Sequence, residues 1–108
     1  EKSRKYLFYI LLAIDLIEKF IVDITDFNSY QNDLKTQSAV ERQLAIIGEA
    51  LNQLKKIDPD LEIENAKQII AFRNRLIHAY DSIDNSIVWA IINRFLKNIK
   101  AEIQELIK

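Results

Sequence analysis

The sequence predicts an all-α protein, and three observations support that prediction. The 108 residues include one Gly and one Pro, too few for the turns of a strand-rich fold. Apolar residues recur at steps of three and four, the spacing of an amphipathic helix, and polar segments separate these stretches. With 49% hydrophobic residues, a chain of this length is expected to form one domain over residues 1–108.

The first half of the chain contains two predicted helices. The first covers residues 3–24, and a polar connection over 25–35 follows, with room for one short helical turn. The second covers residues 36–56 and has Gly48 in its interior, where we expect a neighbouring backbone to approach closely. The apolar stripe of the first helix consists of Leu7, Ile10, Ile14, Ile17, Ile21 and Ile24, and that of the second of Val40, Leu44, Ile47, Leu51 and Leu54.

The second half contains two more predicted helices. Pro59 ends the preceding helix because it lacks an amide donor and clashes with the turn before it. A third helix is expected over residues 65–79, and Asp84 is a suitable N-cap for a last helix that reaches the C-terminus. Four helices with short connections favour an antiparallel up-and-down four-helix bundle.

Composition excludes several kinds of site. No Cys means no disulfide, no Cys-based zinc site and no thiol nucleophile. One His cannot build a multi-histidine zinc site, and one Gly cannot form a Gly-rich phosphate loop. We therefore predict neither a metal nor a cofactor. The net charge of -1 means that nucleic-acid binding would need a local patch.

The N-terminal segment predicts neither a signal peptide nor a membrane anchor. A charged start precedes an apolar run from Tyr6 to Ile14, but Asp15, Glu18 and Lys19 interrupt the run. No small-residue cleavage site follows, and no stretch approaches 18 uncharged apolar residues. A cytoplasmic protein is the expectation.

The third predicted helix has a charged residue where an apolar one is expected. At about 100° per residue, Ile69 and Ile77 lie about 40° to either side of Arg73. Arg73 is therefore predicted to lie in the middle of the apolar arc. A buried guanidinium is costly unless it has a partner, a cleft or an anion. A purely structural explanation is an ion pair with Glu41 or Glu49 of the second helix.

The same helix also carries residues that suit a phosphate site. Arg73 offers a planar fork for phosphate, and the only His, His78, belongs to a residue type that exchanges protons near neutral pH. Asn74 and His78 share an adjacent side, and Tyr80 adds a hydroxyl group. Arg73 and His78 are about 140° apart on a regular helix. They converge only if the helix distorts or a second protomer supplies one of them. Arg75 points to the opposite side of the helix, either along the path of a substrate or into solvent.

The octet Arg73-Asn74-Arg75-Leu76-Ile77-His78-Ala79-Tyr80 resembles the R-x4-H-x-Y motif of the HepT-like branch of the HEPN superfamily. The segment from Lys35 to Ala50, which includes Ile-Ile-Gly-Glu-Ala, and the stretch from Ile83 to Trp89 are also similar to that family. The resemblance extends over essentially the whole chain.

The resemblance implies an antiparallel four-helix bundle that forms a homodimer, with the motifs of two protomers facing across a cleft. It implies a metal-independent endoribonuclease toxin whose partner is a nucleotidyltransferase antitoxin of the MntA type. By position, Arg73 and His78 would be catalytic, Asn74 their polar companion, and Tyr80 the acceptor of AMP from the antitoxin. The RNA substrate would be cut by attack of a ribose 2′-OH on the adjacent phosphate.

Two other functions fit the same residues. The chain could be a non-catalytic helical adaptor or protein substrate of a nucleotidyltransferase. It could also be a plain homodimer in which Arg73 forms a structural ion pair.

Overall fold

The computed structural model describes residues 2–79, 81 and 83–108, and the regular elements in these ranges are all helical, which confirms the all-α prediction. The helices are α1 (Lys2–Phe20), α2 (Phe27–Gln31), α3 (Leu34–Ile57), α4 (Ala66–His78), α5 (Asn85–Ala90) and α6 (Leu96–Leu106), with a π-helical segment, η2 (Ile91–Phe95), between the last two. The short helix α2 lies in the predicted connection over 25–35, and Pro59 lies between α3 and α4 as expected.

Aspartates cap three of the helices. Asp26, Asp33 and Asp84 precede α2, α3 and α5, and each carboxylate accepts a hydrogen bond of 2.8–3.0 Å from a backbone amide in the first turn. Hydrogen bonds from first-turn residues lower the pKa of all three carboxyl groups, because they favour the charged form. The Asp84 cap confirms the sequence prediction.

The first helix is shorter than predicted. It ends at Phe20, and residues 21–23 form a turn. Ile21 and Ile24 nevertheless pack, half-buried, against the core. Apolar periodicity indicates which side chains face the core. Here Ile21 and Ile24 still face the core although the helical hydrogen bonds of α1 have ended.

The C-terminal segment is not one regular helix, which corrects the prediction for residues 85–108. The π-helical η2 interrupts it, and the consecutive residues Ile91 and Ile92 are both buried. A π turn inserts one residue into a helix and so shifts the buried face along the chain. Val88 and Leu96 are buried on the two sides of this segment, whereas Ile87 is 41% exposed.

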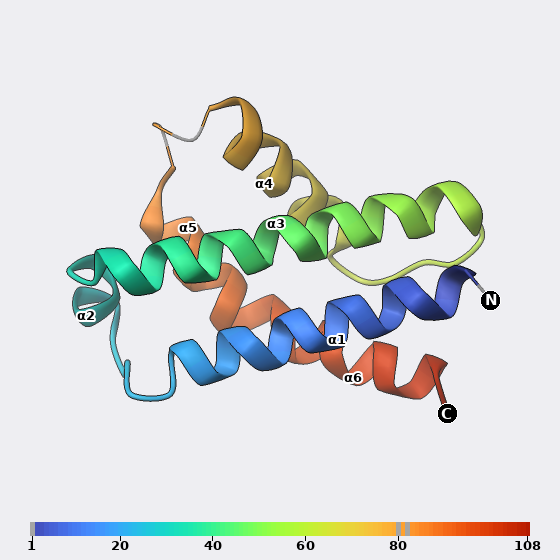
Figure 1. Ribbon diagram of the computed structural model, residues 1–108, viewed down its shortest axis with the longest axis horizontal. Helices are drawn as coiled ribbons and strands as arrows, with labels where there is room; N and C mark the ends of the chain where they lie inside the picture. Colours follow the sequence, from blue (N-terminus) through green and yellow to red (C-terminus); the bar gives the residue numbers. More distant parts are fainter. Residues whose placement is uncertain (1, 80, 82) are drawn as a thin grey trace.

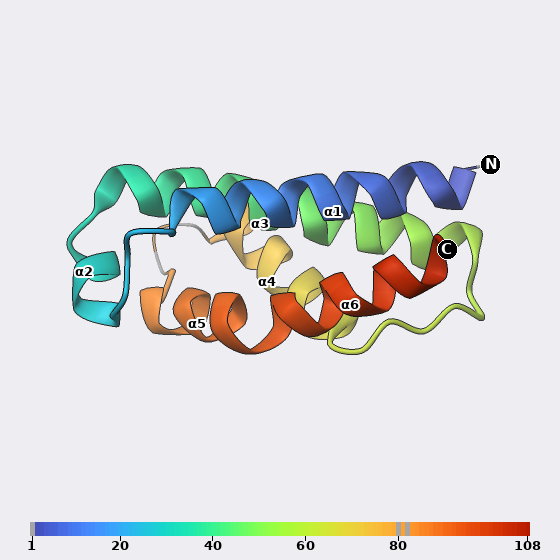
Figure 2. The same ribbon diagram turned by 90° about the horizontal axis from the view of Figure 1, so that it is seen from below.

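The helices pack around one core (Figures 1 and 2). α1 and α3 lie side by side and run in opposite directions, and the α5–η2–α6 segment lies on the other side of the molecule. α4 packs on α3 and crosses it obliquely. The core includes the fully buried side chains of Ile10, Ile14, Ile17, Leu44, Ile47, Ile69 and Ile99. A helical bundle is therefore established, and the regular antiparallel four-helix arrangement stays a prediction.

The start of α1 and the end of α6 lie at the same end of the molecule (Figure 1), where the Arg4 guanidinium donates a 3.2 Å hydrogen bond to the Ile107 carbonyl oxygen. Within the described ranges, no helix combines the length and apolar character needed to cross a membrane.

Candidate functional site

The candidate site begins where α4 crosses α3 at Gly48. A Cβ atom at this position would lie 2.9 Å from Cγ of Arg73 and 3.2 Å from the carbonyl oxygen of Ile69, and still closer to Cβ of Arg73. A Cβ has no room there, so only glycine lets the two helices approach this closely. The predicted close approach at Gly48 is confirmed, and the neighbour is the turn of α4 that carries Arg73.

Gly48→Ala should therefore destabilise the protein. Overpacking costs about 1–3 kcal/mol, and alanine recovers about 1 kcal/mol of helix propensity. We expect a net loss of about 1 kcal/mol, measured as the free energy of unfolding in urea. Arg42→Ala, at an exposed position of the same helix, is the matched control and should change little. A Gly48→Ala protein more stable than the wild type would contradict this account of the crossing.

The residue after Gly48 holds the Arg73 side chain. Nη2 of Arg73 is 2.5 Å from Oε2 of Glu49, and Nη1 donates a 3.0 Å hydrogen bond to Oδ1 of Asn74. The amide of Gln53, one turn along α3, donates a 2.9 Å hydrogen bond to the other Glu49 oxygen. These contacts join four side chains of two helices and fix the direction of the guanidinium.

Arg73 is less buried than the sequence predicted. The side chains of Arg73 and Glu49 keep 23% and 43% of their surface exposed. The buried side of α4 is formed by Ile69 and Phe72, and Ile77 is 49% exposed. Arg73 therefore lies at the edge of the apolar face, and the prediction that placed it in the middle was wrong because it left out Phe72. The structural ion pair with Glu49 is present.

The structure brings Arg73 and Asn74 together but not Arg73 and His78. Asn74 and His78 are both exposed, and His78 is the last residue of α4. α4 stays α-helical from Ala66 to His78, so no distortion turns the imidazole toward the guanidinium. Among the described residues no hydrogen bond or ion pair joins these two side chains. Of the two predicted routes to convergence, a second protomer is the one left for a composite site.

The remaining motif residues have different outcomes. Tyr80, the predicted acceptor of AMP, lies outside the described residues. Arg75 is exposed, and its charge contributes to the lowered pKa of Asp84, after the larger effect of hydrogen bonds from Ser86.

Sequence reasoning missed a buried polar group that packs against α5. The Tyr30 ring is fully buried and packs against Trp89, with ring centroids 5.4 Å apart, and its hydroxyl has no hydrogen-bond partner within the described part of the chain. Burial raises the pKa of Tyr30, and the Glu41 carboxylate adds to the effect. Burial also raises the pKa of Glu41. Glu41 is therefore near Tyr30, and Glu49 is the carboxylate that pairs with Arg73.

A second polar contact ties the start of α5 to α2 and α3. The buried Gln37 amide donates 2.9 Å hydrogen bonds to the carbonyl oxygens of Tyr30 and Gln31. The Asn85 amide donates to side-chain oxygens of Gln31 and Gln37, at 3.1 and 3.3 Å. These bonds anchor the segment that follows the R-x4-H-x-Y motif. A single sequence hides them because the partners are up to 54 residues apart.

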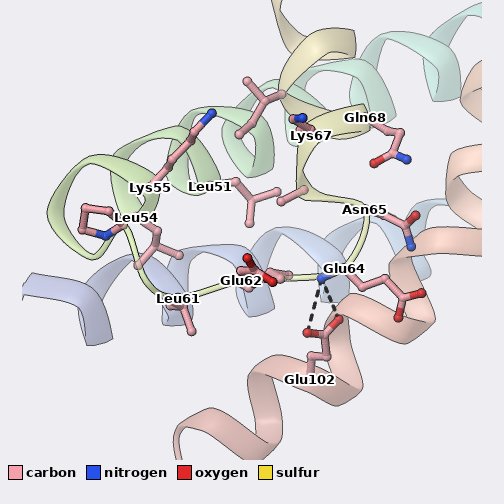
Figure 3. A pocket seen from close by; sticks show the side chains of 14 residues that line it. Leu51, Leu54, Lys55, Leu61, Glu62, Glu64, Asn65, Lys67, Gln68 and Glu102 are labelled. Carbon is pink, nitrogen blue, oxygen red and sulfur yellow. Dashed lines mark hydrogen bonds between the residues drawn. The ribbon is translucent and has the colours of Figure 1, made fainter.

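The described residues also contain a cavity of about 660 Å³, at the opposite end of α4 from His78 (Figure 3). Its walls come from the end of α3, the connection before α4 and Glu102 of α6, whose carboxylate accepts hydrogen bonds of 3.0 and 3.3 Å from the Glu64 amide. None of the predicted catalytic residues lines it. Within residues 2–79, 81 and 83–108, no group of three or more His, Asp or Glu side chains is placed to hold a metal ion.

Known proteins resemble this chain over almost its whole length. It is 35% identical over 113 aligned residues to a protein of Thermococcus cleftensis named "Probable ribonuclease HepT", with 100% of this chain and 99% of that protein covered. It is 36% identical to a "Putative RNase" of Methanocaldococcus jannaschii, covering 97% of this chain and 87% of the relative. A further "Putative RNase" of the same organism is 32% identical, with 94% and 93% covered.

No solved structure matches the chain significantly. The family model described as "Ribonuclease HepT-like" matches residues 10–106. The matched range includes the Arg73–Tyr80 octet, and the chain belongs to the HepT-like ribonuclease family.

Proposed function

We propose that this protein is an endoribonuclease that cleaves RNA without a metal ion, by attack of a ribose 2′-OH on the adjacent phosphate. Membership of the HepT-like ribonuclease family and the RNase names of its relatives support ribonuclease activity. One observation carries the assignment of the site. The Arg73 guanidinium is held at the surface by Glu49 and Asn74, on the helix that ends in the only His of the chain.

Arg73 would stabilise the charge that builds up on the phosphoryl oxygens. A guanidinium has five N–H donors, and the contacts with Glu49 and Asn74 orient it while leaving others for a ligand. Its exposed fraction of 23% gives a phosphate access to it. A donor oriented before the reaction stabilises the transition state without the cost of reorganisation.

His78 would transfer protons. The reaction needs a base for the 2′-OH and an acid for the leaving 5′-oxygen, and one imidazole per chain cannot fill both roles in a single step. A two-fold symmetric homodimer brings two His78 side chains to one cleft. Ile77, which lies between Asn74 and His78 in the sequence, is exposed and supports such a contact, because it adds an apolar group to the exposed surface of α4. We propose that two antiparallel four-helix protomers face each other in this way.

The motif also suggests how the activity would be controlled. By family resemblance, an MntA-type nucleotidyltransferase would transfer AMP to Tyr80, and the two proteins would form a cytoplasmic toxin–antitoxin pair. An adenylyl group two residues after His78 would place a phosphate within the motif, where it could pair with Arg73 and exclude RNA.

The cleavage chemistry gives a direct test. With excess chelator present, the purified protein should cut a single-stranded RNA and leave 2′,3′-cyclic phosphate and 5′-hydroxyl ends, read by mass spectrometry. A DNA oligonucleotide of the same sequence is the matched control, and it should stay intact because it lacks the 2′-OH. Products with 3′-hydroxyl and 5′-phosphate ends would show attack by water and overturn this mechanism. Complex formation with the nucleotidyltransferase, with no RNA cut, would favour the adaptor function instead.

A further inference from the structure

The outer face of α1 carries large apolar side chains that stay about half exposed, with Arg4 over the Phe8 ring, 5.6 Å from its centroid, and Tyr6 edge-on to Tyr9. Phe8, Tyr9 and Leu12 are 49%, 47% and 60% exposed. Around the helix axis this face is directly opposite the buried stripe of Leu7, Ile10, Ile14 and Ile17. In Figure 1 α3 lies between α1 and α4, so the α1 face is separate from the Arg73–His78 site.

The exposed residues of this face form a seam with a regular repeat. Lys5, Phe8, Leu12, Asp15 and Lys19 follow one another at steps of three and four, and all five are exposed. At about 100° per residue they fall within about 80° of arc. This 3-4 spacing is the one with which a helix packs along a second helix.

The order of charges along the seam is complementary to itself in one orientation. When two copies of α1 pair antiparallel about a two-fold axis beside residue 10, Phe8 of each copy lies opposite Leu12 of the other. Lys5 then lies opposite Asp15, because each is five residues, about 7.5 Å, from the axis. A parallel pair would instead place Lys5 against Lys5 and Asp15 against Asp15.

The contacts that Lys5 and Asp15 make inside the protomer leave both side chains able to pair with a second copy. Lys5 lies over the Tyr6 ring, with Nζ 5.1 Å from the ring centroid, and has no acidic partner among the described residues. Asp15 shares Lys100 with Glu18, and Glu18 is the closer partner, at 2.8 Å against 3.4 Å. Two carboxylates thus share one ammonium group, and the Asp15 side chain keeps 52% of its surface exposed.

We propose that the α1 face binds the α1 face of a second copy of this chain, in an antiparallel two-fold contact with Phe8 and Leu12 at its centre and a Lys5–Asp15 ion pair at each end. The seam is apolar at the middle and oppositely charged at its two ends, as a self-complementary surface requires. This interface is independent of the proposed ribonuclease site. With the α4 contact also present, two different two-fold interfaces would assemble four copies when their axes intersect at right angles.

Charge reversal tests the contact. Lys5→Glu places two acidic groups together at both ends of the seam, and Asp15→Lys places two basic groups there. Each single variant should raise the dissociation constant of the α1 contact about tenfold or more and halve the particle mass in light scattering. The double variant restores opposite charges and should recover the wild-type mass. Lys97→Glu, an exposed charge reversal on α6, is the matched control and should leave the mass unchanged.

A cysteine experiment tests the orientation, because the native chain has no Cys. Lys5→Cys chains mixed with Asp15→Cys chains should form a disulfide-linked pair under mild oxidation. Neither variant alone should, because like positions are about 15 Å apart along the axis in the antiparallel pair. Linkage of Lys5→Cys to itself would show a parallel contact and overturn the proposal. The proposal would also be overturned if both single charge variants kept the wild-type mass and no mixed disulfide formed.

The test of the α1 contact does not depend on the ribonuclease assignment. None of these substitutions touches α4, so RNA cleavage serves as a separate readout. A failed α1 contact in a protein that still cleaves RNA would overturn this inference alone. Circular dichroism of each variant shows whether the helices are intact, and the double charge variant separates an effect of the interface from an effect on folding.

Discussion

His78→Ala will reduce the rate of RNA cleavage by at least about 10²–10⁴-fold, the usual contribution of one general acid or base, because the variant dimer loses both imidazoles. The expected loss is large because the chain has no other histidine to replace the imidazole. Folding should be unaffected, since His78 is exposed at the end of α4. The measurement is the single-turnover rate on a labelled RNA, with circular dichroism to confirm the helix content. Equal rates for the variant and the wild type would remove His78 from the mechanism.

Mixing experiments will show whether one active site needs His78 from two protomers. When an equal amount of His78→Ala chain exchanges with the wild type, about half of the wild-type chains acquire a variant partner in a two-fold dimer. Activity should then fall to about half of its starting value if both imidazoles act in one cleft. Activity that stays constant would mean that each His78 works alone. Arg42→Ala chains, added in the same amount, are the control. They keep His78, so exchange with them should not lower the activity of the wild-type chains.

The second large effect is expected at Arg73. Arg73→Ala should lower the rate of the chemical step by about 10²–10³-fold, the usual effect of removing one preorganised donor from the transition state. Arg73→Lys should recover only part of this rate, because an ammonium group keeps the charge but not the planar fork that contacts both Glu49 and Asn74. Single-turnover rates at saturating RNA measure the effect.

Stability measurements separate this catalytic role from a structural one. The Arg73–Glu49 pair is partly exposed, and such pairs contribute about 0–1 kcal/mol. Arg73→Leu should therefore unfold at nearly the wild-type urea concentration and still lose cleavage. Unchanged cleavage in Arg73→Leu would favour the structural ion pair as the only role of this residue. Glu49→Gln, which keeps the shape but removes the charge, should lower the rate less than loss of Arg73 itself.

Local patterns in the sequence predicted much of the fold. The scarcity of Gly and Pro and the 3-4 periodicity predicted helices, and the positions of Pro59 and Asp84 marked two of the boundaries correctly. Each of these signals acts within a few residues of its own position. The end of α1 and the π-helical η2 were missed because both depend on how the segments pack, as the consecutive buried residues Ile91 and Ile92 show.

In the candidate site, too, some features follow from the sequence and others only from the tertiary structure. The sequence by itself determined the set of reactive groups, because one His, no Cys and a motif within eight residues leave few other choices. Glu41 and Glu49 were equally good partners for Arg73 until the crossing of α3 and α4 was known. Only the tertiary structure decided for Glu49. Gly48 lets the turn with Arg73 lie against α3, and the following carboxylate is then within contact of the guanidinium. The physical reason is that helical periodicity fixes which side a residue faces, whereas the point where two helices cross depends on the side-chain volumes of both.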